Sequence, residues 1–201
     1  MNPSRVLSPD AEVHDDGVIW RGGPSLQISV PKAATYVGAD RWVLFDVADA
    51  EVHLYVEADS SRRVQRYYWI QFESFLPSLP DKRYGPVNQP VATLAGLPFH
   101  VIARAGPSSE PARAGSDLEH VLRLFVKNSY TLPRELATVR LLHRRADARS
   151  EVMLIYGEDL GVSGTTLANV IGSTDYLPAW KPVAEAATQR ALKQFTVKRV
   201  V

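Results

Sequence analysis

The clearest pattern in the chain is an alternation of apolar and polar side chains over residues 51–57. Successive side chains of a β-strand point to opposite faces, so this alternation predicts a strand with one buried face and one wet face. Together with residues 42–47 it predicts a hairpin around a short polar connection. The aliphatic residues expected in the core are Val52, Leu54 and Val56, and His53 is expected on the wet face.

A longer strand is predicted over residues 64–75, where large side chains occupy both faces. Aromatic and β-branched residues favour the strand conformation, and the period of two separates them into two sets. One set is Tyr68, Ile70 and Phe72. The other set is Tyr67, Trp69, Gln71 and Glu73.

The remaining strands are predicted from short β-prone stretches that lie between turn residues. Two hairpins and a single strand are expected. The first hairpin pairs residues 18–20 with 26–30 around Gly22, Gly23 and Pro24, the second pairs residues 138–144 with 151–156 around the polar turn 145–150, and the single strand covers 99–103.

Two amphipathic helices are predicted. Residues 116–128 open with Ser116 as an N-cap and Glu119 three positions later, followed by apolar residues at helical spacing. Residues 176–195 place Pro178 in a first turn and repeat small alanines along one face. An alanine-rich face allows close packing against a sheet.

These elements predict an α+β fold: a curved, mainly antiparallel sheet built from hairpins, with two principal helices packed on one side of it. Residues 1–17 carry prolines and acidic residues without periodicity, which predicts a flexible N-terminal arm. Residues 18–201 are expected to form a single domain, since β-rich domains commonly reach this length.

Residues 76–98 contain five prolines and two glycines, which disfavour a long helix or a central strand. Loops of this length in compact domains are often lids or binding loops. A static crossover would have the same composition, so both interpretations stay open.

Composition removes several classes of function. Hydrophobic residues make up 45% and charged residues 22%, as in ordinary globular proteins, and there is no cysteine for a disulfide, a thiolate nucleophile or a cysteine-bound metal. The net charge of +1 is spread along the chain, so no nucleic-acid or membrane partner is expected. No signal-peptide core or membrane-length apolar run is evident, which predicts a cytoplasmic protein.

A local basic cluster accompanies the second hairpin, but acidic neighbours favour a solvated hairpin tip over a binding patch. Its members are Arg140, Arg144, Arg145 and Arg149.

Catalytic and metal motifs are weak. Neither a paired-histidine metal motif nor a cofactor motif occurs, and none is predicted. The glycine-containing stretch 161–166 lacks the spacing of a nucleophile elbow and the lysine of a phosphate loop, which favours a turn with Ser163 or Thr165 capping a helix. His53 and His120 are expected at the surface.

An acid–base enzyme would need a histidine and a carboxylate in one cleft, and the candidates are His143, His100, Glu158 and Glu73. The hairpin register is expected to place His143 nearer Val152 than Glu158.

The second face of residues 64–75 is the best candidate for a ligand-lined sheet, because aromatic walls supply affinity and a few polar groups fix orientation. The expected ligand-binding residues are Tyr67, Trp69, Gln71 and Glu73, with Arg83 and Tyr84 near the mouth. Three functions stay open: a small-molecule-binding module, a cofactor-independent acid–base enzyme, and a structural protein that forms a homodimer through this face or through a sheet edge.

Overall fold

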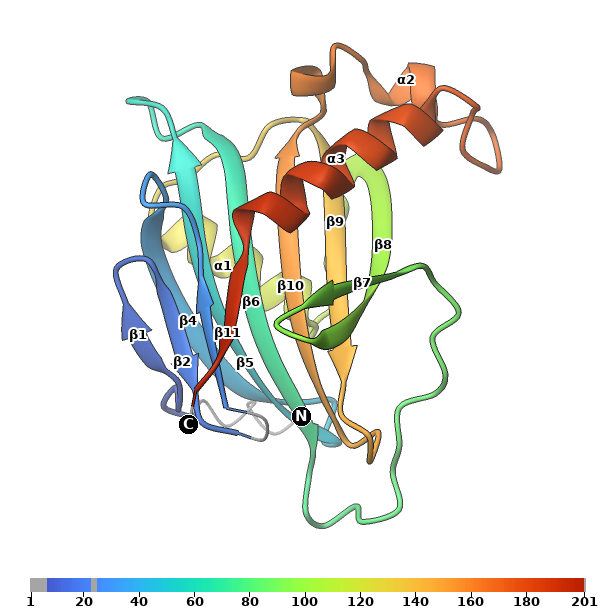
Figure 1. Cartoon of the computed structure of the whole chain (residues 1–201). Helices are drawn as coiled ribbons and strands as arrows, with labels where there is room; N and C mark the ends of the chain where they lie inside the picture. Colours follow the sequence, from blue (N-terminus) through green and yellow to red (C-terminus); the bar gives the residue numbers. More distant parts are fainter. Residues whose placement is uncertain (1–6, 23–24, 201) are drawn as a thin grey trace.

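A computed structural model describes residues 7–22 and 25–200 of the chain. These residues form eleven strands in two antiparallel sheets (Figure 1). The smaller sheet has the strand order β1-β2-β3-β11, and the larger sheet has the order β4-β5-β6-β10-β9-β8-β7. The α+β class with mainly antiparallel sheets is therefore as predicted, although neither sheet is strongly curled.

The strands of the smaller sheet are β1 (Glu12–His14), β2 (Gly17–Trp20), β3 (Leu26–Ser29) and β11 (Thr196–Arg199). Those of the larger sheet are β4 (Thr35–Leu44), β5 (Ala48–Ala58), β6 (Val64–Phe75), β7 (Val91–Leu94), β8 (Leu97–Pro107), β9 (Glu135–Arg144) and β10 (Ser150–Asp159). The helices are α1 (Asp117–Lys127), a 3₁₀ turn η1 (Leu160–Ser163), α2 (Leu167–Val170) and α3 (Trp180–Gln194).

The three predicted strand pairings are confirmed, because β2 pairs with β3, β4 with β5, and β9 with β10. The β4–β5 turn was misplaced, however: it lies at residues 45–47, which were expected in the strand, whereas residues 48–50 belong to β5 and β4 already begins at Thr35. Two segments expected to be irregular contain strands instead. Residues 12–14 of the predicted arm pair with β2, and residues 91–94 of the predicted loop pair with β8. Both are short edge strands with little periodicity of their own, so only their partners reveal them. Gly23, Pro24 and residues 1–6 lie outside the described residues.

The two faces of the larger sheet are covered differently. We call the face that carries Tyr68 and Ile70 the α3 face, because the smaller sheet and α3 pack on it in one apolar core. The opposite face carries Tyr67 and Trp69, and we call it the α1 face, because α1 packs on it. The division of β6 into two sets of side chains is thus as predicted.

The two principal helices lie on opposite faces of the larger sheet (Figure 1), which corrects the expectation that both cover the same side. On α3, Ala187 and Ala191 are fully buried against the sheet, as its alanine-rich face predicts. On α1, Val121, Leu124 and Phe125 are buried over β4 and β5. Ser116 caps α1 by accepting a hydrogen bond from the Glu119 amide.

Two histidines expected at the surface are buried. His53 is 0% exposed, because the smaller sheet covers the face that alternation alone makes wet, and its Nε2 lies 2.7 Å from Glu51 Oε1. His120 is 2% exposed: its ring stacks on Trp42, and its Nδ1 lies 2.7 Å from Asp40 Oδ2. Both expectations were wrong because the covering layers come from distant sequence.

The basic hairpin tip is exposed at residues 145–147, as expected, but two of its arginines make specific contacts. Arg144 pairs with Glu151 and donates to the Gly85 carbonyl. Arg149 holds the segment after β6 by donating to a ring of backbone carbonyls. These belong to Phe75, Leu76, Leu79, Pro80 and Lys82.

Replacing Arg149 should loosen this segment. In Arg149→Ala the five carbonyls lose their shared donor, and a net loss of about 1.4 kcal/mol of local stability raises the open population roughly tenfold. Trypsin cleavage after Lys82 and Arg83, followed by mass spectrometry, should accelerate accordingly. The control is Arg145→Ala, because the exposed Arg145 side chain has, among the described residues, a single ionic contact, at 3.8 Å to Asp147. Equal cleavage rates in both variants would contradict the anchoring role.

Candidate functional site

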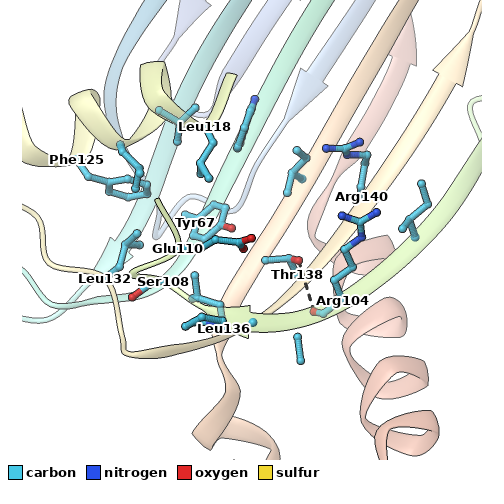
Figure 2. A pocket seen from close by; sticks show the side chains of 18 residues that line it. Tyr67, Arg104, Ser108, Glu110, Leu118, Phe125, Leu132, Leu136, Thr138 and Arg140 are labelled. Carbon is cyan, nitrogen blue, oxygen red and sulfur yellow. Dashed lines mark hydrogen bonds between the residues drawn. The ribbon is translucent and has the colours of Figure 1, made fainter. Parts of the chain in front are cut away.

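A cavity of about 250 Å³ lies on the α1 face, between α1 and the strands β6, β10, β9 and β8 (Figure 2). Tyr67 and Trp69, two of the candidate ligand-binding residues, contribute to its lining from β6. The chain after β8 forms a further wall through residues 105–110. The apolar lining from α1 and β9 consists of Leu118, Val121, Leu122, Phe125 and Leu136.

The strand register explains why side chains from four strands meet on the floor of this cavity. Trp69 is opposite Ile155, Ile155 is opposite Arg140, and Arg140 is opposite Ile102. Facing residues on adjacent strands point to the same side of a sheet. One row across four strands therefore combines an aromatic ring, two isoleucines and a guanidinium group.

The neighbouring row fixes the position of Tyr67. Tyr67 pairs with Gly157, and a Cβ atom at Gly157 would come within 2.1 Å of the tyrosine ring. The ring therefore lies across β10 in space that only glycine leaves open. It also meets Phe125 edge to face at a centroid distance of 5.7 Å, and burial raises the pKa of its hydroxyl. Tyr67 thus joins the sheet floor to α1.

Two cationic side chains contribute to the lining. Arg140 is half-buried on β9, and Arg104 is exposed on β8. Within the described part of the chain, neither guanidinium group has a hydrogen bond or an ion pair. The charge of Arg140 nonetheless lowers the pKa values of Tyr67, Asp117 and Glu151 against the larger raising effect of burial. Arg140 therefore stands between the apolar cavity and a group of buried acids.

The other predicted polar residues form a chain of hydrogen bonds beside the cavity. Trp69 Nε1 donates to Gln71 Oε1 at 2.8 Å, and Gln71 Nε2 donates to Glu73 Oε2 at 3.3 Å. Tyr84 donates its hydroxyl to Glu73 Oε1 at 2.6 Å. Arg83 is exposed and donates to the carbonyls of Pro80 and Lys82. Of the predicted ligand-binding residues, only Tyr67 and Trp69 line the cavity; those outside the lining are Gln71, Glu73, Arg83 and Tyr84.

Glu73 is the most perturbed carboxyl group near the site. Burial is the main cause that raises its pKa to about 7, and the charges of Asp117 and Glu151 add to the effect against hydrogen bonds from Tyr84 and Gln71. Burial likewise raises the pKa of Asp117, whose Oδ1 is buried without a hydrogen-bond partner among the described residues. A negative charge on Glu73 or Asp117 is therefore costly, because each of these carboxyl groups is itself buried.

The histidines proposed for acid–base chemistry do not meet their carboxylates. His143 pairs with Val152, as expected, while Glu158 pairs with Ala137, six residues along β9 and about 20 Å away. His143 lies on the α3 face, and its Nδ1 is 2.9 Å from the Pro98 carbonyl oxygen. Glu158 is bound instead by Arg190 and by the hydroxyl of Tyr156.

His100 lies on the α1 face of β8, three strands from β6 and about 14 Å from the strand that carries Glu73. Its Nδ1 is 3.4 Å from the Gln89 carbonyl oxygen. No histidine–carboxylate pair named from the sequence is therefore assembled in one cleft by the described residues.

The glycine-containing turn has a structural role that differs in detail from the one expected. Gly164 ends η1 in the left-handed conformation, and Thr166 stands at the N-cap of α2 without a side-chain hydrogen bond. Ser163 Oγ accepts a hydrogen bond from Arg190 at 3.0 Å.

Sequence reasoning missed the cavity residues that lie outside β6. Arg140 carried a usable signal, because a charged residue stands there between the buried Val139 and Leu141 of a predicted strand. Long-range packing alone brings the other lining residues to the site, so the local sequence pattern gives no sign of them. They include Arg104, Thr138 and the residues of the apolar face of α1.

Within the described residues, no cluster of three or more histidine, aspartate or glutamate side chains is placed to hold a metal ion. Nor does any helix among residues 7–22 and 25–200 combine the length and apolar character needed to cross a membrane. Comparison with known families, curated proteins and solved structures gives no match. The function must therefore be argued from the site itself.

Replacing Glu73 should change how stability depends on pH. Burial raises its folded-state pKa from the ordinary value of 4.5 to about 7, so its contribution to the free energy of unfolding is fully present below pH 4.5 and is lost as pH rises through 7. In Glu73→Gln this loss is absent. As pH rises from 4.5 to 8, the free energy of unfolding of the variant should therefore increase relative to that of the wild type by at most about 3 kcal/mol.

Urea unfolding of both proteins at several pH values measures this difference. The exposed α3 variant Glu185→Gln serves as a control and should follow the wild type. A wild-type-to-Glu73→Gln difference that stays constant with pH would contradict the raised pKa.

Proposed function

We propose that the protein binds a small, largely apolar molecule in the cavity on the α1 face. The observation that carries this proposal is the 250 Å³ hollow beside Tyr67 and Trp69. The hollow opens to the surface beside the exposed lining residues Arg104, Pro107 and Glu110, so a ligand can enter it. An apolar cavity of about 150 Å³ accommodates benzene, so this one scales to a ligand of roughly ten non-hydrogen atoms.

The arrangement of the lining suits a ligand site. Aromatic and aliphatic walls come from α1 and β6, while the charged side chains and the serine and threonine hydroxyls occupy a few positions on β8 and β9 and in the segment 108–110 that follows β8. Binding pockets commonly combine apolar walls with a small number of orienting polar groups. Because the walls of this cavity belong to both a helix and a sheet, its lining side chains are held in a rigid frame.

The two alternatives have less support. Tyr67 and Trp69 are only 7% and 6% exposed, so the aromatic face offers little surface for the homodimer suggested by its composition. The separation of His143 and His100 from Glu158 and Glu73 removes the geometry that an acid–base enzyme with these residues needs. Binding without chemistry is the simplest function for this cavity.

A series of straight-chain alcohols tests the proposal without involving charge. Hexanol, heptanol and octanol should bind saturably at a single site, each added methylene tightening binding about fourfold, because a buried CH₂ contributes roughly 0.8 kcal/mol. Isothermal titration calorimetry gives the dissociation constants. Trp69 fluorescence reports the location, since the Trp180→Phe variant should keep the ligand-induced change and Trp69→Phe should lose it.

A cavity-filling variant makes the test site-specific. Thr138 lies on the cavity floor opposite Gly157, so Thr138→Phe should occupy the space and weaken octanol binding more than tenfold. Thr196→Phe on β11 is the matched control, because Thr196 is an exposed strand residue far from the lining. Absence of saturable alcohol binding, or equal binding by both variants, would overturn the proposal.

A further inference from the structure

The cavity has a polar end as well as an apolar body. Figure 2 shows the guanidinium groups of Arg104 and Arg140 near one another at one side, whereas Leu118, Phe125, Leu132 and Leu136 lie at the other. We infer that the ligand is an amphiphile with a single carboxylate, which the two arginines bind while its short apolar tail extends toward α1. This inference rests on the proposed binding function and adds the chemical class of the ligand.

The strand register places the two arginines together. Arg104 is opposite Thr138 on β9, and Arg140 follows Thr138 by two residues on the same face. Diagonal neighbours of this kind lie within reach of long side chains. The Thr138 hydroxyl between them donates at 3.5 Å to the Arg104 carbonyl oxygen. Two cations and a hydroxyl therefore gather at one edge of the floor.

No carboxylate among the described residues forms an ion pair with the cationic end, although Asp117 and Glu151 lie near enough for the charge of Arg140 to lower their pKa values against the larger effect of burial. Arg140 is half-buried between Ile102 and Ile155. A partly buried cation of this kind is costly unless it is paired. Glu151, whose pKa is raised by burial and lowered in part by the charge of Arg140, already accepts a hydrogen bond from Arg144 at 2.9 Å.

Glu110 is the one acidic residue that contributes to the described lining, and its side chain is exposed. The lining thus carries two positive charges and one negative charge, which favours an anion over a cation. The planar guanidinium group presents parallel N–H donors that match a carboxylate better than a hydroxyl or an amine.

The size of the cavity limits the rest of the ligand. Roughly ten non-hydrogen atoms correspond to an eight-carbon acid such as octanoate. Its tail would contact Tyr67, Phe125 and Leu136, and its head would reach Arg140.

Four probes of equal tail length test the head group: octanoate, octanol, octylamine and octyl phosphate, titrated by calorimetry at pH 7.5. Octanoate should bind at least tenfold more tightly than octanol, and octylamine more weakly than octanol. Tighter binding of octyl phosphate than of octanoate would overturn the carboxylate assignment. Equal affinities for octanoate and octanol would overturn the role of the arginines while leaving the cavity proposal intact. If no probe binds, the proposed function itself fails.

Variants assign the effect to the arginines. Arg140→Gln should remove most of the octanoate preference while leaving octanol affinity within about twofold of wild type, and the exposed Arg104→Gln should reduce the preference by a smaller factor. Arg134→Gln is the control with the same change in net charge; this exposed residue is outside the lining, so it should keep the full preference. An unchanged preference in both Arg140→Gln and Arg104→Gln would contradict the inference.

Discussion

The structure depends on how much of a wide sheet one short helix can cover. Seven strands span about 29 Å, whereas a helix with its side chains is only about 10–12 Å across. On the α3 face, the smaller sheet and α3 share the covering. On the α1 face, α1 packs over β4 and β5, so β8, β9 and β10 extend beyond it. The cavity forms where this coverage ends.

The residues at that boundary stabilise the packing of the sheet and shape the cavity at the same time. Gly157 lets the Tyr67 ring cross β10 and meet Phe125, which supports the helix and shapes the cavity at once. Trp69 gives one edge to the cavity, and its indole N–H begins the buried hydrogen-bond chain to Glu73. Two residues of β6 thus have several roles at once: Tyr67 packs against α1, Trp69 hydrogen-bonds to the buried polar side chains, and both line the cavity.

Sequence patterns predicted the strands well, because alternation in β5 and β6 reflects a local period of two. Tyr67 and Trp69, two of the ligand-binding candidates named from the sequence, line the cavity. The patterns could not predict what covers each face. His53 is buried because the smaller sheet lies over it, and His120 is buried because its ring stacks on Trp42, and neither contact is visible in the local sequence. Arg140 was visible as a charge, but its position beside Ile102 depends on long-range strand pairing.

The central claim is that the apolar cavity beside β6 can bind a small molecule. Xenon binds in apolar cavities and carries no head group, so it tests the hollow independently of ligand chemistry. In a crystal of the protein pressurised with xenon, the account predicts an anomalous peak within contact distance of Tyr67, Phe125 and Leu136. A xenon-treated crystal with side chains filling that space and no peak there would contradict it.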